Sequence, residues 1–340
     1  MKILLIKAAC TRYYGQTVVP MGLLYLSSAL KKAGYTEIKI IHLDLENPAE
    51  EALGRQIAGY KPDIIGISAI TAEAVSMHRV AALAKSALPG ALIVAGGAHP
   101  TGYTADCMQD PNIDAAVRNE GELTFLELVK TVERGEPFAG LAGLSYRKNG
   151  AIVNNPPREF ITELDALPMP DWKMADLERY SGYIPHSPFL YTRKYANIVT
   201  SRGCPFSCTF CHNVMGKKFR AHSPKRVIDE LKYLKEGLGV ENIEITDDIF
   251  NLDLNRAKAI MRGIIDAGLG LRIFLSNGVR ADALDEELIG LMRRAGVRYL
   301  CIAVETASPH LQREIKKNVN LEKTRAIASS LTANGIFVNG

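Results

Sequence analysis

The sequence lacks the features that mark a membrane-spanning or nucleic-acid-binding chain. None of its apolar runs reaches the roughly 18 residues that cross a bilayer as a helix. The 340 residues include 41 basic and 37 acidic side chains, for a net charge of +4, and no block of like charges. This balance gives no signal for nucleic acid. The short apolar start indicates a buried first strand rather than a secretion signal, so we expect a cytoplasmic protein.

Cysteine is scarce, and its placement excludes a disulfide framework. There are six cysteines, of which Cys10, Cys107 and Cys301 stand alone. A chain of this size with so scattered a set is not held together by disulfides, and we expect the lone cysteines to be small buried apolar residues. The other three lie within eight residues, at 204, 208 and 211, directly after an apolar segment. Clustered thiols of this kind indicate a metal.

The lack of a fourth nearby cysteine decides which metal we expect. Cys204, Cys208 and Cys211 have the spacing C-x3-C-x2-C. Three thiolates can hold three irons of a 4Fe-4S cubane and leave the fourth iron open to a substrate, whereas a closed ferredoxin cluster needs a fourth cysteine. A zinc site completed by His212 is the alternative. Zinc ligands normally come as two pairs with a longer gap between them, so we favour the open cluster.

Strand and helix patterns alternate through the first 135 residues. Apolar runs typical of buried strands are separated by segments with apolar residues at helical spacing. Such an order predicts a doubly wound parallel α/β sheet with helices on both faces. We expect strands at residues 2–7, 37–43, 63–68, 91–95 and 114–117, and helices at 21–33, 49–58, 73–88 and 122–134.

A hairpin and a proline-rich segment interrupt this alternation. The hairpin is expected at residues 143–153, with Asn149 and Gly150 as its turn. Six prolines between residues 156 and 188 predict a linker that packs across the surface without a regular element. We therefore expect three parts, residues 1–140, 141–192 and 193–340.

A second strand–helix series fills the rest of the chain. Ser223 and Pro224 are expected to cap and begin its first helix. A fifth strand directly before Gly340 would leave an open apolar edge, which suggests a fragment whose barrel is truncated at that strand. The expected strands are 196–200, 241–246, 271–276, 299–304 and 336–338, with later helices at 254–267, 285–295 and 321–334.

The cysteine segment resembles the defining motif of a known superfamily. Residues 200–212 read TSRGCPFSCTFCH, and the form C-x3-C-x-aromatic-C, with Phe210 as the aromatic, is similar to the motif of the radical S-adenosylmethionine (radical SAM) superfamily. The flanks, together with PMGLLYL at 20–26, GGAHPT at 96–101 and NEGE at 119–122, resemble its branch with an N-terminal cobalamin-binding domain. The resemblance implies a cobalamin-type sheet followed by a partial (β/α) barrel that carries the cluster.

Polar residues follow the later strands, where barrel enzymes place their chemistry. By resemblance, the Asp247–Asp248 position contacts the methionine amino group of S-adenosylmethionine, and a carboxylate suits an ammonium group. Arg280 would pair with the methionine carboxylate and Glu305 would hold the ribose hydroxyls, with Asn277 beside them. Helix caps or solvated loop charges are the alternative for each of these residues.

The first half offers loops for a second cofactor. No G-x-G-x-x-G occurs there, so a dinucleotide fingerprint is missing. By resemblance Ser68, Gly96, Gly97 and His99 would line a cobalamin site, although a tight turn also explains the glycine pair. The loop after the first strand, residues 10–15, has no histidine, so a histidine from this loop cannot be the lower ligand of cobalt.

The resemblance implies a radical enzyme that cleaves S-adenosylmethionine to a 5′-deoxyadenosyl radical. Methyl transfer from cobalamin to carbon is the expected outcome, with cyclisation as a related one. The expected partners are a small-molecule substrate and an electron donor such as flavodoxin or ferredoxin. Two alternatives stay open: a radical enzyme whose first domain binds no cobalamin, and an inactive metal-binding fragment.

Overall fold

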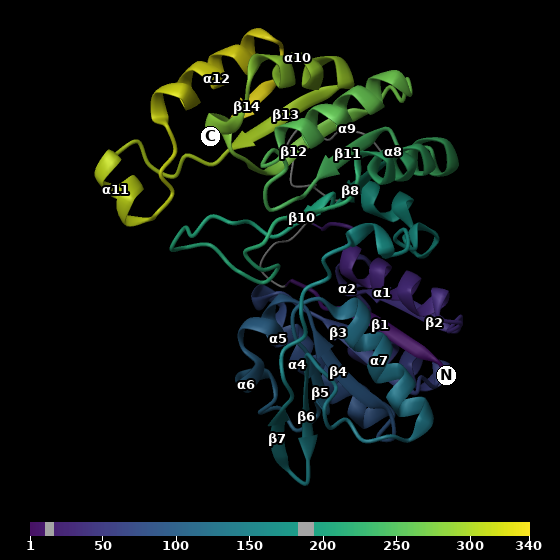
Figure 1. Cartoon of the computed structure of the whole chain (residues 1–340). Helices are drawn as coiled ribbons and strands as arrows, with labels where there is room; N and C mark the ends of the chain where they lie inside the picture. The colour runs from purple at the N-terminus through teal and green to yellow at the C-terminus, as the bar shows by residue number, and fades with distance from the viewer. Residues whose placement is uncertain (11–16, 183–193) are drawn as a thin grey trace. The chain divides into compact units, whose positions relative to one another are not determined.

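A computed structural model describes residues 1–10, 17–182 and 194–340, which form two compact units (Figure 1). Unit 1 comprises Met1–Ile161 and Leu167–Asp176, and unit 2 comprises Thr162–Ala166 and Leu177–Gly340. Most of the histidine-free loop after Cys10 and the prolines 185 and 188 lie outside the described residues. No helix in the described part of the chain is long and apolar enough to cross a membrane.

Unit 1 is built on a seven-stranded sheet in the order β2-β1-β3-β4-β5-β6-β7. The first five strands pair in parallel, as predicted, and their central residues are apolar and buried. The hairpin β6–β7 adds to β5 in antiparallel fashion, an extension of the sheet that the sequence did not predict. The strands are β1 Ile3–Lys7, β2 Ile38–His42, β3 Ile64–Ser68, β4 Leu92–Gly96, β5 Ala115–Val117, β6 Leu144–Lys148 and β7 Ala151–Asn154.

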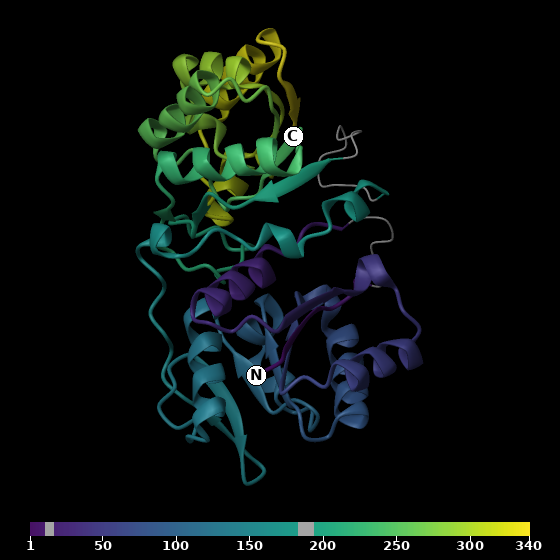
Figure 2. The same ribbon diagram turned by 90° about the vertical axis from the view of Figure 1, so that its right-hand side faces the viewer.

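Helices cover both faces of this sheet (Figures 1 and 2). On one face Leu53 and Met77, from α3 and α4, share a core with Ile6, and on the other Leu30 and Phe125, from α1 and α7, form a second core. Burial on both faces explains why the strands are continuous apolar runs. The helices are α1 Met21–Lys32, α2 Leu43–Glu46, α3 Glu50–Tyr60, η1 Thr71–Glu73, α4 Ala74–Ala87, α5 Ala98–Gly102, α6 Thr104–Cys107 and α7 Gly121–Arg134.

Unit 2 contains a five-stranded parallel sheet in the order β14-β13-β12-β11-β8, so that each strand lies beside its predecessor in the chain. This sequential order is that of a (β/α) series, and the α/β prediction for this half is confirmed. A small antiparallel pair, β9 with β10, was not predicted. The strands are β8 Tyr195–Ile198, β9 Ser201–Arg202, β10 Arg220–Ala221, β11 Asn242–Ile245, β12 Arg272–Val279, β13 Val297–Ile302 and β14 Phe337–Asn339.

The helices of unit 2 begin where the sequence places capping side chains. The hydroxyl of Ser223 accepts a hydrogen bond from the backbone N–H of Arg226, and Pro224 occupies the first turn. Asp253, Asp285 and Asn320 cap later helices in the same way. The helices are α8 Pro224–Lys232 with its continuation η5 Tyr233–Gly237, α9 Leu254–Asp266, η6 Ala281–Ala283, α10 Glu286–Ala295, α11 Pro309–Glu314 and α12 Leu321–Ala333.

The proline-rich segment is more ordered than a surface linker. It forms the short 3-10 turns η2 Leu164–Ala166, η3 Trp172–Met174 and η4 Leu177–Gly182. Trp172 is buried rather than spread on the surface, which corrects the expectation. Asp171 ties the segment to α1: its backbone N–H donates to the carbonyl of Leu24, and its carboxylate accepts from Ser27 and pairs with Lys31, both at 2.6 Å.

Replacing Asp171 with alanine should destabilise unit 1 by about 1–3 kcal/mol, because Ser27 and Lys31 lose a charged partner in a half-buried place. The emission of Trp172, the one tryptophan of the sequence, reports the change during urea unfolding. Asp176→Ala is the matched control, since Asp176 is exposed. Equal midpoints for the two variants would contradict the proposed tie.

Candidate functional site

The three clustered cysteines lie in one loop of unit 2, residues 203–219, which we name the cysteine loop. It leaves β9 and returns through β10, and the pairing of Arg202 with Arg220 closes its base. Cys204 and Cys208 are half-buried, Cys211 is exposed, and all three are free thiols. The fold therefore presents three potential thiolates from a loop whose two ends are held together.

Gly203 is a feature of this loop that the sequence reasoning missed. Its φ of +82° lies in the left-handed region, and a Cβ placed there would lie 2.4 Å from the carbonyl oxygen of Lys218 and 3.0 Å from that of Met215. A side chain at this position is excluded by both conformation and space. The backbone N–H of the next residue, Cys204, donates to the carbonyl of Gly216 at 3.3 Å, so the loop folds back on its own start.

Asp247 is buried, and both of its carboxylate oxygens accept hydrogen bonds. One carboxylate oxygen accepts from the backbone N–H of Thr200 at 2.6 Å, and the other accepts from the hydroxyls of Thr200 and Ser201 at 2.5 and 2.6 Å. Burial raises the pKa of this carboxyl, against the effect of these donors and of nearby Arg256. Asp247 thus holds the strand end from which the cysteine loop departs, and its role as a ligand of S-adenosylmethionine stays a prediction.

Asp248 turns the other way. One oxygen accepts from the backbone N–H of Gly203 at 3.1 Å, and the other lies 3.9 Å from Nε2 of His212. Its side chain keeps 20% of its surface exposed, so it retains access to solvent beside the cysteine loop. Of the two predicted carboxylates, Asp248 is the one that stays accessible beside the cysteine loop, and its role as a ligand stays a prediction.

Arg280 contacts the cysteine loop directly. Its guanidinium lies 4.2 Å from the ring centroid of Phe206, in cation–π geometry. The same group pairs with Asp282 at 2.9 Å and donates to the carbonyls of Lys317 and Asn318. In this arrangement Arg280 supports the loop, and its predicted pairing with a methionine carboxylate would have to displace these partners.

A second cation sits against the other aromatic of the motif. Nζ of Lys317 lies 5.8 Å from the ring centroid of Phe210 and 3.3 Å from Oε1 of Glu305. The N–H of Thr209 also donates to the carbonyl of Ile315 at 3.0 Å. The residues after α11 therefore contact the cysteine loop and help to fix its position. These segments are about 100 residues apart, and no sequence pattern predicts that they meet.

The remaining predicted residues of this unit lie at the same edge of the sheet. Asn277 is exposed and donates from Nδ2 to the carbonyls of Thr246 and Asp247, at 3.3 Å each. Glu305 follows β13 with a φ of +67°. As expected for parallel strands, the carboxyl ends of β11, β12 and β13 bring these groups towards one edge.

In unit 1, packing within the protein accounts for Gly97 of the predicted glycine pair but not for Gly96. Gly97 has a φ of +98°, and a Cβ there would lie 2.7 Å from the carbonyl oxygen of Ala69 and 3.2 Å from Oγ of Ser68. A Cβ placed on Gly96 would have no described atom within 4 Å beyond its chain neighbours. His99 is only 4% exposed and stacks on Tyr103, with ring centroids 5.5 Å apart. These contacts explain Gly97 by close packing of two loops, and the cobalamin role of the set stays a prediction.

Comparison with known proteins identifies the family. The family described as "B12 binding domain" matches residues 8–129, and the "Radical SAM superfamily" matches residues 198–340. An uncharacterized methyltransferase of Pyrococcus horikoshii is 35% identical over 331 residues, covering 95% of this chain and 70% of that protein. The chain belongs to the radical SAM superfamily, in its branch with an N-terminal B12-binding domain. The prediction from residues 200–212 is confirmed.

Other relatives of this radical SAM protein carry out different reactions. A cytidylyl-2-hydroxyethylphosphonate methyltransferase of Streptomyces wedmorensis is 28% identical over 100% of the chain and 72% of its own length. An anaerobic magnesium-protoporphyrin IX monomethyl ester cyclase of Rubrivivax gelatinosus is 29% identical over 93% of the chain, and the chain spans 57% of that cyclase.

Two solved structures share the fold. The methyltransferase TsrM from Kitasatospora setae, with cobalamin and a [4Fe-4S] cluster bound, has a TM-score of 0.79 at 19% identity, covering 99% of this chain and 66% of that one. The radical enzyme OxsB, with aqua-cobalamin and S-adenosylmethionine bound, has a TM-score of 0.82 at 19% identity, and the chain spans 48% of it. The radical SAM chain thus corresponds to about half to two thirds of these structures.

The cysteine loop of this radical SAM protein suits a cluster better than a single zinc ion. A mononuclear ion draws its thiolates together, whereas each thiolate of a cubane binds its own iron. Among the described residues, the group of His, Cys, Asp or Glu ligand atoms that lie within 4.8 Å of one another does not include Cys204, Cys208 or Cys211. What favours the cluster is the C-x3-C-x2-C spacing, because zinc ligands normally come as two separated pairs.

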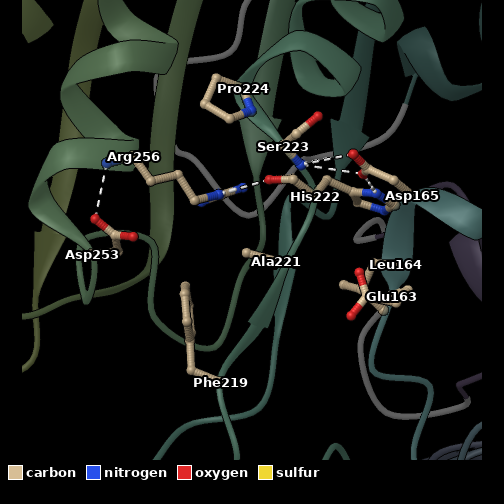
Figure 3. Close-up of a pocket in the computed structure, with 10 residues that line it drawn as sticks. All are labelled: Glu163, Leu164, Asp165, Phe219, Ala221, His222, Ser223, Pro224, Asp253 and Arg256. Carbon is tan, nitrogen blue, oxygen red and sulfur yellow. Dashed lines mark hydrogen bonds and ion pairs between the residues drawn. The ribbon is translucent and has the colours of Figure 1, made fainter.

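A cavity of about 390 Å³ is lined by residues at the end of the cysteine loop, in β10 and at the start of α8, and by residues 163–165 (Figure 3). Arg256 donates there to the carbonyls of His222 and Thr200, at 2.8 and 2.7 Å, and Asp165 accepts from His222 and from the backbone of Ser223. The residues that line the cavity therefore form hydrogen bonds to the two backbone segments that flank the cysteine loop. It is lined by Glu163, Leu164, Asp165, Phe219, Ala221, His222, Ser223, Pro224, Asp253 and Arg256.

Replacing Gly203 with alanine should destabilise unit 2 by about 1–3 kcal/mol, because the Cβ meets the Lys218 carbonyl in a left-handed backbone. Gly268→Ala is the matched control: Gly268 has a φ of +59° but nothing within 4 Å of its Cβ position. Chemical unfolding followed by circular dichroism measures both. The difference between the variants isolates the steric contact, and equal losses would show that conformation alone accounts for the effect.

The stability of unit 2 should fall as the pH drops from 6.5 to about 4. Burial lowers the pKa of His222 from 6.5 to about 4, outweighing the nearby Asp165. Because the unfolded chain binds this proton more readily, His222 contributes stability above pH 6.5 that is lost through this window, up to about 3 kcal/mol.

Urea unfolding at pH 7 and at pH 4.5 tests this dependence. His222→Gln should reduce the difference between the two pH values, whereas His310→Gln, at an exposed site, should leave it unchanged. An unchanged difference in His222→Gln would contradict the assignment.

Proposed function

We propose that this protein is a radical SAM enzyme that cleaves S-adenosylmethionine at a 4Fe-4S cluster held by Cys204, Cys208 and Cys211. When bound, the cluster supplies the electron that generates a 5′-deoxyadenosyl radical, and cobalamin in the first domain supplies a methyl group for transfer to carbon. The observation that carries the proposal is the cysteine loop: three free thiols in one loop, closed at its base and held by two cations.

The residues around the loop divide into supports and ligands. Gly203, Arg280 and Lys317 fix the loop, so the thiols need little rearrangement to bind iron. Asp248 and Glu305 keep exposed carboxylate surface, at 20% and 38% of their side chains, and suit the ammonium and the ribose hydroxyls of S-adenosylmethionine. Asn277 would bind beside them, while Asp247 and Arg280 would act mainly by positioning.

The cobalamin site is proposed for the carboxyl ends of β3 and β4. Ser68 and Gly96 are the predicted residues that remain accessible there, since Ser68 is half-buried and the space around Gly96 is open. Gly97 shapes the same turn through its contact with Ala69. A radical enzyme whose first domain binds no corrinoid is the alternative, supported by the burial of His99.

Several broader expectations also belong to this proposal. The functional parts are residues 1–140 for cobalamin, 141–192 as a connecting segment and 193–340 for radical chemistry. The enzyme would act on a small molecule in the cytoplasm and take its electron from a flavodoxin or ferredoxin. Relatives named as methyltransferases and as cyclases favour methyl transfer with cyclisation as the second possibility.

Anaerobic reconstitution with iron and sulfide tests the proposal. The chain should bind about four irons and four sulfides, and with dithionite and S-adenosylmethionine it should release 5′-deoxyadenosine. Cys208→Ala should reduce the product to the level of a protein-free control, whereas Cys10→Ala, outside the cysteine loop, should leave it unchanged.

Two further readouts separate the alternatives. Bound zinc without sulfide would overturn the cluster assignment, and a cluster that forms without releasing 5′-deoxyadenosine would overturn the activity. Reconstitution with hydroxocobalamin should give a retained corrinoid absorbance after desalting. A chain that yields 5′-deoxyadenosine but never retains the corrinoid would establish the alternative without cobalamin.

A further inference from the structure

A second cluster of metal-ligand types lies in unit 1, away from the cysteine loop in sequence. His78 comes from α4, His99 from α5 and Asp106 from α6, and one ligand atom of each lies within 4.8 Å of the others. The predicted radical chemistry assigns no metal to this group, and of the three residues only His99 has a predicted role, in the cobalamin site. Two imidazoles and a carboxylate are a donor set that proteins use for zinc and for iron(II).

His99 is the residue that demands an explanation. Its side chain is nearly inaccessible, and within the part of the chain that the structure describes neither Nδ1 nor Nε2 has a hydrogen-bond partner. A buried imidazole without any partner is unfavourable, and an unseen ion is among the few causes of such a group in native proteins. The backbone N–H of His99 donates to Ala69, and its ring stacks on Tyr103, so the ring is held in place.

His78 has the support that metal-binding histidines usually have. Its Nδ1 lies 2.7 Å from Oδ2 of Asp110, which fixes the proton on Nδ1 and leaves Nε2 as an electron-pair donor. Asp110 is itself held by the backbone N–H and the side-chain amide of Asn112, at 2.9 and 2.8 Å.

The position of the third ligand agrees with metal binding. Asp106 is exposed, so its carboxylate brings a negative charge and leaves a side of the group open to water. The group thus offers two imidazoles and one carboxylate.

We propose that His78, His99 and Asp106 bind one divalent transition-metal ion, with zinc as the best match and water as the remaining ligand. Three protein ligands and a water give the four-coordinate arrangement that zinc prefers. The ion would cross-link α4 to the segment α5–α6 that follows the Gly96–Gly97 turn, because each of these helices supplies one ligand. It would therefore stabilise the loop region of unit 1 independently of the cysteine loop.

This assignment changes the expected role of His99. The sequence placed His99 among residues lining a cobalamin site, but at 4% exposure its ring offers almost no surface to a large corrinoid. A single ion needs only the two or three atoms that already converge. His99 is thus better explained as a metal ligand beneath the loop than as a contact on its surface.

Zinc titration of a protein without the cysteine-loop thiols tests the proposal. The variant Cys204→Ala/Cys208→Ala/Cys211→Ala removes the competing thiolates, and no corrinoid is added. Competition with a chromophoric chelator should show one equivalent of tightly bound zinc. Cobalt(II) should bind at the same stoichiometry and give the visible absorption of a four-coordinate site.

Variants at accessible positions identify the ligands. In the same background, His78→Gln and Asp106→Asn should each weaken zinc binding at least 10-fold, and Asp110→Asn about 10-fold to 100-fold. His310→Gln, an exposed histidine of unit 2, is the matched control and should bind as before. Circular dichroism confirms that each variant is folded. Zinc affinity that is unchanged in both His78→Gln and Asp106→Asn, or an absence of stoichiometric binding, would overturn the site.

Discussion

The buried carboxylate of Asp247 is the interaction on which the geometry of unit 2 depends. It accepts hydrogen bonds from the backbone and hydroxyl of Thr200 and from the hydroxyl of Ser201, at the point where the chain passes from β8 into β9. Arg256 binds the carbonyl of Thr200 from the other side. Because each charged group would be left uncompensated without its neighbours, the network holds the start of the cysteine loop in one position.

The contrast between Asp247 and Asp248 shows how adjacent identical residues acquire different tasks. Asp247 is buried, and both of its carboxylate oxygens accept hydrogen bonds from within the protein. Asp248 accepts a hydrogen bond from the backbone N–H of Gly203 and stays accessible beside the cysteines. The sequence placed both carboxylates after a strand, at the edge where ligands bind. Which of the two is buried depends on the hydroxyls of residues 200 and 201, which come from a different strand.

The parts of the fold that follow from local pattern were predictable, and those that rest on distant contacts were not. Continuous apolar runs gave the parallel strands, and Ser223 with Pro224 gave a helix start, because both signals are local. The β9–β10 pair, α11 and the cations over Phe206 and Phe210 join segments far apart in the chain. The sequence could place Arg280 at the carboxyl edge of the sheet in unit 2, but it could not predict that Arg280 contacts Phe206.

The cations of the site stabilise the loop before any cofactor binds. Arg280 was predicted to bind an anionic ligand, yet both Arg280 and Lys317 lie against aromatic rings of the cysteine motif and bind internal acceptors. A loop fixed in this way loses less conformational freedom when its thiols bind metal, so more of the binding free energy remains as affinity. The aromatic position of the C-x3-C-x-aromatic-C motif thus acquires a physical role, because the ring of Phe210 binds the ammonium group of Lys317.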